Sequence, residues 1–144
     1  MYIEENFKNL NFEKMTITYE SGYFSDSKIK ETITINGNKV EYVKIQFTFI
    51  ESKSIELINA TFLISDLKLL QELDSHLKIN TLCNDDVDYG VCDGSPISLN
   101  VKYEYGITVD KTCFLEHLPS NIENILKTVR SIFKKYNPLP ICIK

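Results

Sequence analysis

The sequence predicts an α+β protein with a single antiparallel sheet of about five strands, in the chain order βββαββα, and two helices packed on one face. Three observations predict this class. Several segments alternate apolar and polar residues, as half-buried strands do. An Asn-Gly pair joins two of these segments closely, which is typical of a hairpin. Two other segments carry a single apolar stripe at helical spacing, so each helix is expected to bury one side only.

The first two strands are predicted at residues 15–20 and 28–35, separated by a polar turn at residues 21–27. The Asn-Gly-Asn run at residues 36–38 is expected to close a hairpin after the second strand. Asn and Gly tolerate the positive φ angles that tight hairpin turns require. Hairpin connections of this kind imply an antiparallel sheet.

The third strand carries apolar residues on one face, namely Val43, Ile45, Phe47 and Phe49. Val40 and Tyr42 have the opposite parity, so we predict a bulge or twist near residue 42. The other face of every predicted strand is expected to be polar and open, formed by Thr16, Thr18, Lys30, Thr32, Thr34, Lys44, Gln46, Thr48, Asn100, Lys102, Thr108 and Asp110. A solvated face is the ordinary interpretation, but an open sheet also offers a partner a flat surface.

The apolar period changes at Ser65, which is expected to cap a first helix with leucines at helical spacing over residues 67–77. Residues 97–105 then alternate strictly as a fourth strand. A turn at Tyr105-Gly106 leads to a fifth strand over residues 107–113.

A second helix begins with the capping box formed by Ser120 and Glu123, just after Pro119. Its apolar stripe is Ile122, Ile125, Leu126, Val129, Ile132, Phe133 and Tyr136.

The whole chain, residues 1–144, is expected to form one α+β domain with irregular segments at residues 1–13 and 137–144. The formal net charge of -4 argues against nucleic acid as a partner, because phosphate neutralisation needs surplus Lys and Arg. No stretch is apolar enough for a signal peptide or a membrane span. We therefore expect a cytoplasmic bacterial or phage protein with no membrane partner. Its acidity suits a protein partner with a basic surface.

Signals of catalysis are weak. The sequence has no dinucleotide-binding glycine motif, phosphate loop, nucleophile elbow or zinc-protease motif. Its thiols and imidazoles are not paired at zinc-ligand spacing, and we assign no catalytic residue, metal ligand or cofactor to Cys83, Cys92, Cys113, Cys142, His76 or His117. Cys113 shares a face with Val109 and is expected in the core. A Cys–His or carboxylate site assembled in space stays open as an alternative.

The acidic loop at residues 84–94 contains Asp85, Asp86, Asp88 and Asp93 and no Lys or Arg. Three interpretations stay open. The loop could bind calcium, although the EF-hand spacing is missing. It could be a recognition patch for a basic partner, or a solvated loop whose Asp and Gly residues make turns. We take its four Asp residues as candidate partner contacts.

Tyr23 and Phe24 are two further candidate partner contacts, because they lie between small polar residues in the first turn. Aromatic residues at a loop tip are typical of protein-binding hot spots. The alternative is that Phe24 folds under the sheet and covers the core.

Residues 16–20 followed by Ser-Gly-Tyr-Phe at residues 21–24 resemble the opening of emfourin-like proteins. These are small bacterial α+β proteins that inhibit thermolysin-type zinc metallopeptidases. The resemblance implies an α+β fold and an inhibitory role. The chain departs from the family pattern in three places: Tyr23 replaces the second glycine of a Ser-Gly-Gly-Phe turn, residues 28–60 look inserted, and a tail follows Tyr136.

We therefore expect a non-catalytic protein-binding or inhibitory module. Its partner would be a protease, a toxin or a bacterial defence protein, the last blocked as a phage-encoded anti-defence inhibitor would block it. Two alternatives stay open: a small cytoplasmic enzyme with a site assembled in space, and a structural component that self-associates through the sheet face or an edge strand.

Overall fold

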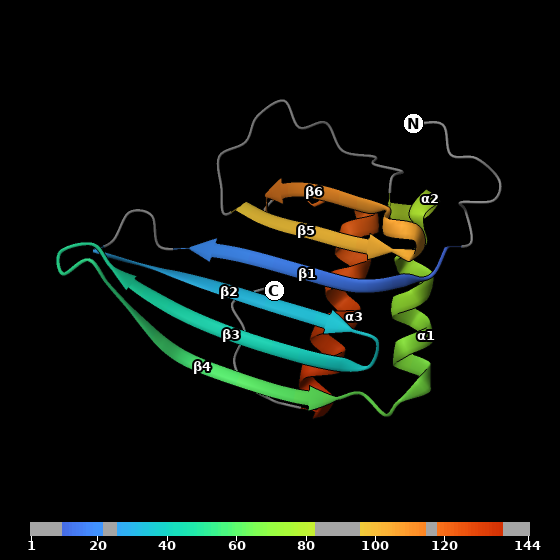
Figure 1. The fold of residues 1–144 in the computed structure, drawn as a ribbon, viewed down its shortest axis with the longest axis horizontal. Coiled ribbons are helices and arrows are strands. Elements are labelled where there is room, and N and C mark those ends of the chain that lie inside the picture. The colour runs from blue at the N-terminus through green and yellow to red at the C-terminus, as the bar shows by residue number, and fades with distance from the viewer. Residues whose placement is uncertain (1–9, 22–25, 83–95, 115–117, 137–144) are drawn as a thin grey trace.

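An antiparallel sheet with helices on one face forms the part of the chain that the computed structural model describes, residues 10–21, 26–82, 96–114 and 118–136 (Figure 1). The elements in these ranges are β1 (Phe12–Ser21), β2 (Ser27–Asn36), β3 (Lys39–Thr48), β4 (Lys53–Leu63), α1 (Leu67–His76), α2 (Ile79–Leu82), β5 (Pro96–Tyr103), the 3₁₀ turn η2 (Glu104–Gly106), β6 (Thr108–Phe114) and α3 (Ser120–Tyr136).

The six described strands lie in the order β4-β3-β2-β1-β5-β6, and all neighbours are antiparallel. The predicted class, α+β with one antiparallel sheet, is confirmed. The predicted number of elements is wrong, because β4 and the four-residue helix α2 were missed. Helix α2 is too short to show a period. In β4 the register slips between Lys44 and Ile45 of β3, which leaves Leu57 as an extra residue and breaks the alternation.

Helix α3 runs across the sheet on the side away from the viewer in Figure 1. Its first half packs against β5 and β6, where Ile122 lies near Leu99 and Cys113. Its last turns reach β3 and β4, where the Phe133 ring meets Tyr42 and Phe62 edge-on, with centroids 5.3 and 5.4 Å apart. A helix of 17 residues is about 25 Å long, close to the span of six strands at roughly 4.8 Å spacing. The helix therefore covers every strand of the sheet.

The strands are longer than the helical layer is wide. Strands of 10 or 11 residues extend for about 34 Å, whereas α1 and α3 side by side cover about 20 Å. The strands therefore project past α3, on the left in Figure 1. We call this projecting part of β1–β4 the arm; it includes Ile29 of β2 and Lys44, Gln46 and Thr48 of β3. Burial follows the same boundary. On the side that faces the helices, Ile33 and Ile35 are fully buried, while Ile29 in the arm is half-buried and Ile55 is 51% exposed.

The bulge predicted near residue 42 is absent from the described strand β3. β2 and β3 pair without interruption from Ser27–Thr48 to Asn36–Lys39, and so the strand keeps one parity throughout. Its helix-facing side carries Val40 and Tyr42 under the helices, and then three polar residues in the arm, Lys44, Gln46 and Thr48. Those three were wrongly predicted on the open face. In the arm no helix covers this side of β3, so the residues on this side do not have to be apolar there.

The start of α1 and the end of α3 are joined by polar contacts. Asp66, and not the predicted Ser65, caps α1 by accepting hydrogen bonds from the backbone N–H groups of Lys68 and Leu69 at 2.9 and 3.4 Å. The Asp66 carboxylate also accepts a hydrogen bond from Lys135 Nζ at 2.6 Å. The Tyr136 hydroxyl accepts one from the Ser65 backbone N–H at 3.1 Å.

We predict that replacing Asp66 with Asn destabilises the protein at neutral pH and has little effect in acid. The hydrogen bond from Lys135 is the largest cause that holds the pKa of Asp66 below its usual value of 3.8. Because the folded-state pKa is the lower one, the stabilisation is complete above pH 3.8 and disappears as the pH falls through the folded-state pKa. Asn keeps an oxygen for the cap, but its amide NH2 group replaces the oxygen that accepts from Lys135, so the change removes the charge and the hydrogen bond from Lys135.

Urea unfolding at a series of pH values from 7 down through the acid range measures this difference. A deficit in Asp66→Asn that does not shrink as the pH falls would show that the ion pair with Lys135 contributes nothing to stability.

Candidate protein-binding surface

An apolar stripe crosses the otherwise polar open face of the arm. We define the stripe as Val43, Ile45, Phe47 and Phe49. The first three alternate with helix-facing residues of β3 and so point away from the helices. Phe49 follows the strand, is 45% exposed and packs its ring edge-on against Phe47, with centroids 5.2 Å apart. The sequence pattern predicts these residues on one face, but only the register shows that this face lies outside the core.

Two further apolar side chains of the β3–β4 hairpin are exposed. Ile50, in the turn that follows Phe49, is 79% exposed, and Leu57, the extra residue of β4 opposite Lys44 and Ile45, is 45% exposed. Single exposed apolar residues are common on any protein, but a group of them is typical of an interaction site. Aromatic rings within such a group are the side chains that most often dominate binding energy.

Charged residues border the stripe on its two sides. On the β2 side, Lys30 pairs with Ile45 and Lys28 pairs with Phe47. On the β4 side, Glu56 pairs with Ile45. Directly paired residues of neighbouring strands share a face, so all three charges lie on the open face with the stripe. An apolar centre with a charged border is the arrangement found in protein–protein interfaces.

Strand β4 is the outer strand of the sheet on this side, and no described residue pairs with its far edge. Edge strands offer unpaired backbone N–H and C=O groups to a partner strand. Here the bulge at Leu57 interrupts that edge, and Lys53 and Glu56 add charges to it. Both features are common protections against edge-to-edge aggregation. The open face is therefore the more accessible apolar surface of the arm.

The carboxylate most removed from water in the described ranges belongs to Glu31, on the helix-facing side of β2. It is fully buried and accepts a hydrogen bond from the Tyr42 hydroxyl. Tyr42 is itself held edge-on by Phe133. A catalytic carboxylate must reach its substrate, and Glu31 has no accessible surface. The geometry favours a structural role in the part of the sheet next to the arm.

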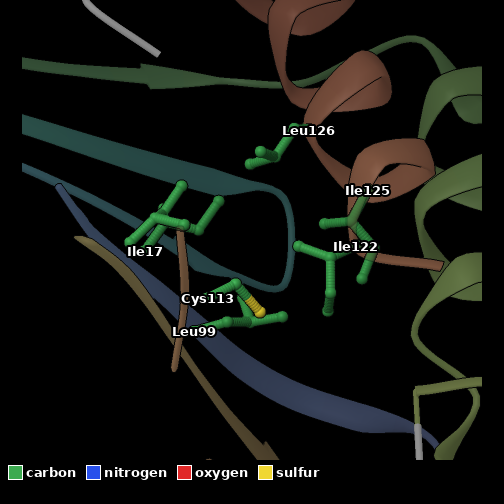
Figure 2. Close-up of a pocket in the computed structure, with 7 residues that line it drawn as sticks. Ile17, Leu99, Cys113, Ile122, Ile125 and Leu126 are labelled. Atoms are coloured by element: carbon green, nitrogen blue, oxygen red, sulfur yellow. The ribbon is translucent and has the colours of Figure 1, made fainter. Parts of the chain in front are cut away.

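A small apolar void lies between α3 and the sheet (Figure 2). Its volume is about 10 Å³, close to the least that one water molecule needs. Its walls are entirely apolar side chains and one thiol, from Ile17, Ile97, Leu99, Cys113, Ile122, Ile125 and Leu126. It has no polar group to orient a ligand, so it is a packing gap. Cys113, predicted as a core residue, is 2% exposed, which confirms that prediction.

A polar hollow of about 150 Å³ lies on the open face near the β2–β3 turn. It is lined by Lys14, Thr34, Asn36, Lys39 and Glu41. Two of these, Lys39 and Glu41, form an ion pair at 3.3 Å in which both side chains are 52% exposed. Exposed ion pairs of this kind contribute little binding or stabilising energy, so this hollow is a weaker candidate site than the stripe.

The partner contacts predicted from the sequence all lie outside the described residues. They are Tyr23, Phe24, Asp85, Asp86, Asp88 and Asp93. The same is true of Cys83, Cys92, Cys142 and His117. Within the described ranges, no three His, Cys, Asp or Glu side chains are grouped closely enough to hold a metal ion. No helix in those ranges has the length and apolar character needed to cross a membrane.

Comparison of the chain with protein-family models, with curated proteins and with solved structures finds no match.

We predict that Tyr42→Phe lowers the free energy of unfolding by about 1–3 kcal/mol, because the buried Glu31 carboxylate loses a hydrogen-bond donor. Urea denaturation measures the loss. The matched control is Tyr105→Phe. Tyr105 is 84% exposed, so removal of its hydroxyl is expected to leave the stability unchanged. Equal stability of Tyr42→Phe and wild type would contradict a structural role for this hydrogen bond.

Proposed function

We propose that this chain is a non-catalytic protein-binding module that blocks a partner protein by covering it with the arm. The observation that supports the proposal is the apolar stripe, which places two phenylalanines and two aliphatic residues on a sheet face beyond the helical layer. Burial of such a surface against a partner is favourable by about 25 cal/mol for each Å² of apolar area.

The stripe is held rigidly before it binds. β3 is paired along its whole length with β2 on one side and with β4 on the other. A surface fixed in this way loses little conformational entropy on binding, which favours affinity. Lys28, Lys30 and Glu56 at the border provide charges that can orient a partner and reject others.

The enzyme alternative has less support from the described residues. Among the groups that a Cys–His or carboxylate site could use, Glu31 and Cys113 are buried within the fold. The open face of the arm, in contrast, carries a partly exposed apolar stripe, which suits binding.

Tyr23 and Phe24, in the segment of the chain between β1 and β2, remain proposed partner contacts, because aromatic residues between small polar residues are typical of protein-binding hot spots. The acidic residues Asp85, Asp86, Asp88 and Asp93 remain proposed contacts for a basic partner.

The class of partner is proposed from the sequence alone. A blocking role suits a protease, a toxin or a defence protein, and the resemblance to emfourin-like proteins favours a metallopeptidase among proteases. The formal net charge of -4 would assist association with a basic protein.

We predict that a column carrying wild-type protein retains a stoichiometric partner from a lysate of the source cells, and that Phe49→Ser/Ile50→Ser weakens this capture by about tenfold or more. Leu67→Ser is the matched control, because Leu67 is 70% exposed at the start of α1, away from the arm. Inhibition assays on the retained protein then test the blocking role.

Two further variants separate the surfaces, Tyr23→Ala/Phe24→Ala and Asp85→Lys/Asp86→Lys/Asp88→Lys. A partner that binds the Phe49→Ser/Ile50→Ser protein as well as wild type would show that the arm is not the contact surface.

A further inference from the structure

The turn that joins β5 to β6 holds an aromatic residue in an unfavourable backbone conformation. Tyr105 has φ 64° and ψ 23°, which is the left-handed region, and Gly106 after it has φ 75°. An L-residue crowds its own backbone in this region, so Gly, Asn and Asp are the residues that usually adopt it. A bulky residue such as Tyr therefore makes the turn less stable than Asn would make it.

The folded protein gives this tyrosine little in return. Its side chain is 84% exposed, so the ring is not packed against the core. The other non-glycine residue with a positive φ in the described ranges is Ser52, with φ 50°, whose side chain is small and polar. Stability does not explain a tyrosine at position 105. A strained residue that stability does not explain is typical of a functional site.

Hydrogen bonds on both sides hold the turn in place. The Tyr103 N–H donates to the Ile107 carbonyl at 2.7 Å, and the Glu104 N–H donates to the Asn11 carbonyl at 3.2 Å. The Glu104 carboxylate in turn accepts from the Asn11 N–H at 2.8 Å. Tyr103 is fully buried, and its hydroxyl donates to the Leu77 carbonyl at the end of α1. A ring presented on such a fixed turn loses little conformational freedom when it is bound.

This turn lies at the end of the sheet opposite the arm. Tyr103 pairs with Phe12 at the start of β1, whereas the arm includes Ile29, which pairs with Ser21 at the end of β1. β1 has 10 residues and extends for about 34 Å. Figure 1 shows β5 ending at the right, while the arm projects to the left. The turn and the apolar stripe are therefore separate surfaces.

We propose that the β5–β6 turn is a second protein-binding surface, in which Tyr105 is the anchor residue and inserts its ring into a pocket of the partner. Tyrosine is one of the residues most enriched among those that dominate binding energy, and it acts by filling a desolvated pocket. The phenol ring requires a pocket with apolar walls and a hydrogen-bonding group at its far end. This inference goes beyond the proposed function, which concerns the stripe.

The charges around the turn favour a protein as the partner over a nucleic acid. Bases that stack on an exposed ring are held by a basic groove that follows the phosphates. Here Lys102 and Lys14, which pair across β5 and β1, are balanced by Glu104 before Tyr105 and by Glu13 before Lys14. The turn thus has no surplus of positive charge.

The melting temperature of Tyr105→Asn tests whether stability explains the tyrosine. Asn adopts the left-handed conformation at less cost, so the variant is expected to melt about 2–4 °C above wild type. Circular dichroism under reducing conditions measures the change. A melting temperature equal to or below that of wild type would show that Tyr105 stabilises the turn, and would overturn the proposal.

Binding is tested on the protein that a wild-type column retains from a lysate of the source cells, purified and titrated against each variant by calorimetry. Tyr105→Asn is expected to raise the dissociation constant by about tenfold or more, although it is the more stable protein. Tyr105→Phe keeps the ring and is expected to raise it less. Leu67→Ser is the matched control, because Leu67 is 70% exposed at the start of α1, and it is expected to bind like wild type.

The arm variant Phe49→Ser/Ile50→Ser separates this proposal from the blocking function. Binding lost in Tyr105→Asn and kept in the arm variant supports the turn and contradicts the arm, and loss in both variants supports both surfaces. Binding kept in Tyr105→Asn and lost in the arm variant overturns the turn and leaves the blocking function standing. A wild-type column that retains no partner overturns both proposals, and a loss in Leu67→Ser equal to that in Tyr105→Asn overturns the assignment to Tyr105.

Discussion

The packing of α3 across the sheet is the interaction on which the rest of the structure depends. Eight of its positions are buried, and they meet strands from β6 at one end to β4 at the other. This contact decides which side of each strand becomes core. It also sets the limit of the core, because two helices cover only about 20 Å of strands that extend for about 34 Å. The arm exists because of that difference in length.

Strand β3 shows the consequence most clearly. Under the helices its core side carries Val40 and Tyr42, and the Tyr42 hydroxyl binds the buried Glu31. Past the helices the apolar residues change to the opposite side and form the stripe. The switch requires no bulge, since the strand keeps its register with β2 throughout. A regular strand thus carries a candidate binding surface because its apolar residues move from the helix-facing side to the open face.

The sequence predicts most of the fold, since α3, β1, β2, β5 and β6 each bury one side with a regular period. The period of β4 is broken at Leu57, where a bulge shifts the register. In β3 the apolar residues alternate regularly, first on one side of the strand and then on the other. The sequence pattern alone cannot tell whether this change comes from a bulge in the strand or from the end of the helical layer that covers it. The stripe was therefore visible in the sequence as a set of residues, but its exposure depends on where α3 ends its contact. The candidate contacts at Tyr23, Phe24, Asp85, Asp86, Asp88 and Asp93 lie outside the described residues.

Whether the stripe is surface or core is tested most directly by the free energy of unfolding of two lysine variants, measured with urea at low protein concentration. Ile45→Lys is expected to cost less than about 1 kcal/mol, because the lysine stem lies along the open face and its ammonium group stays in water. Ile33→Lys, at a fully buried position on the helix-facing side of β2, is expected to cost more than about 4 kcal/mol or to prevent folding. Equal losses in the two variants would place Ile45 in the core and contradict a binding surface on the arm.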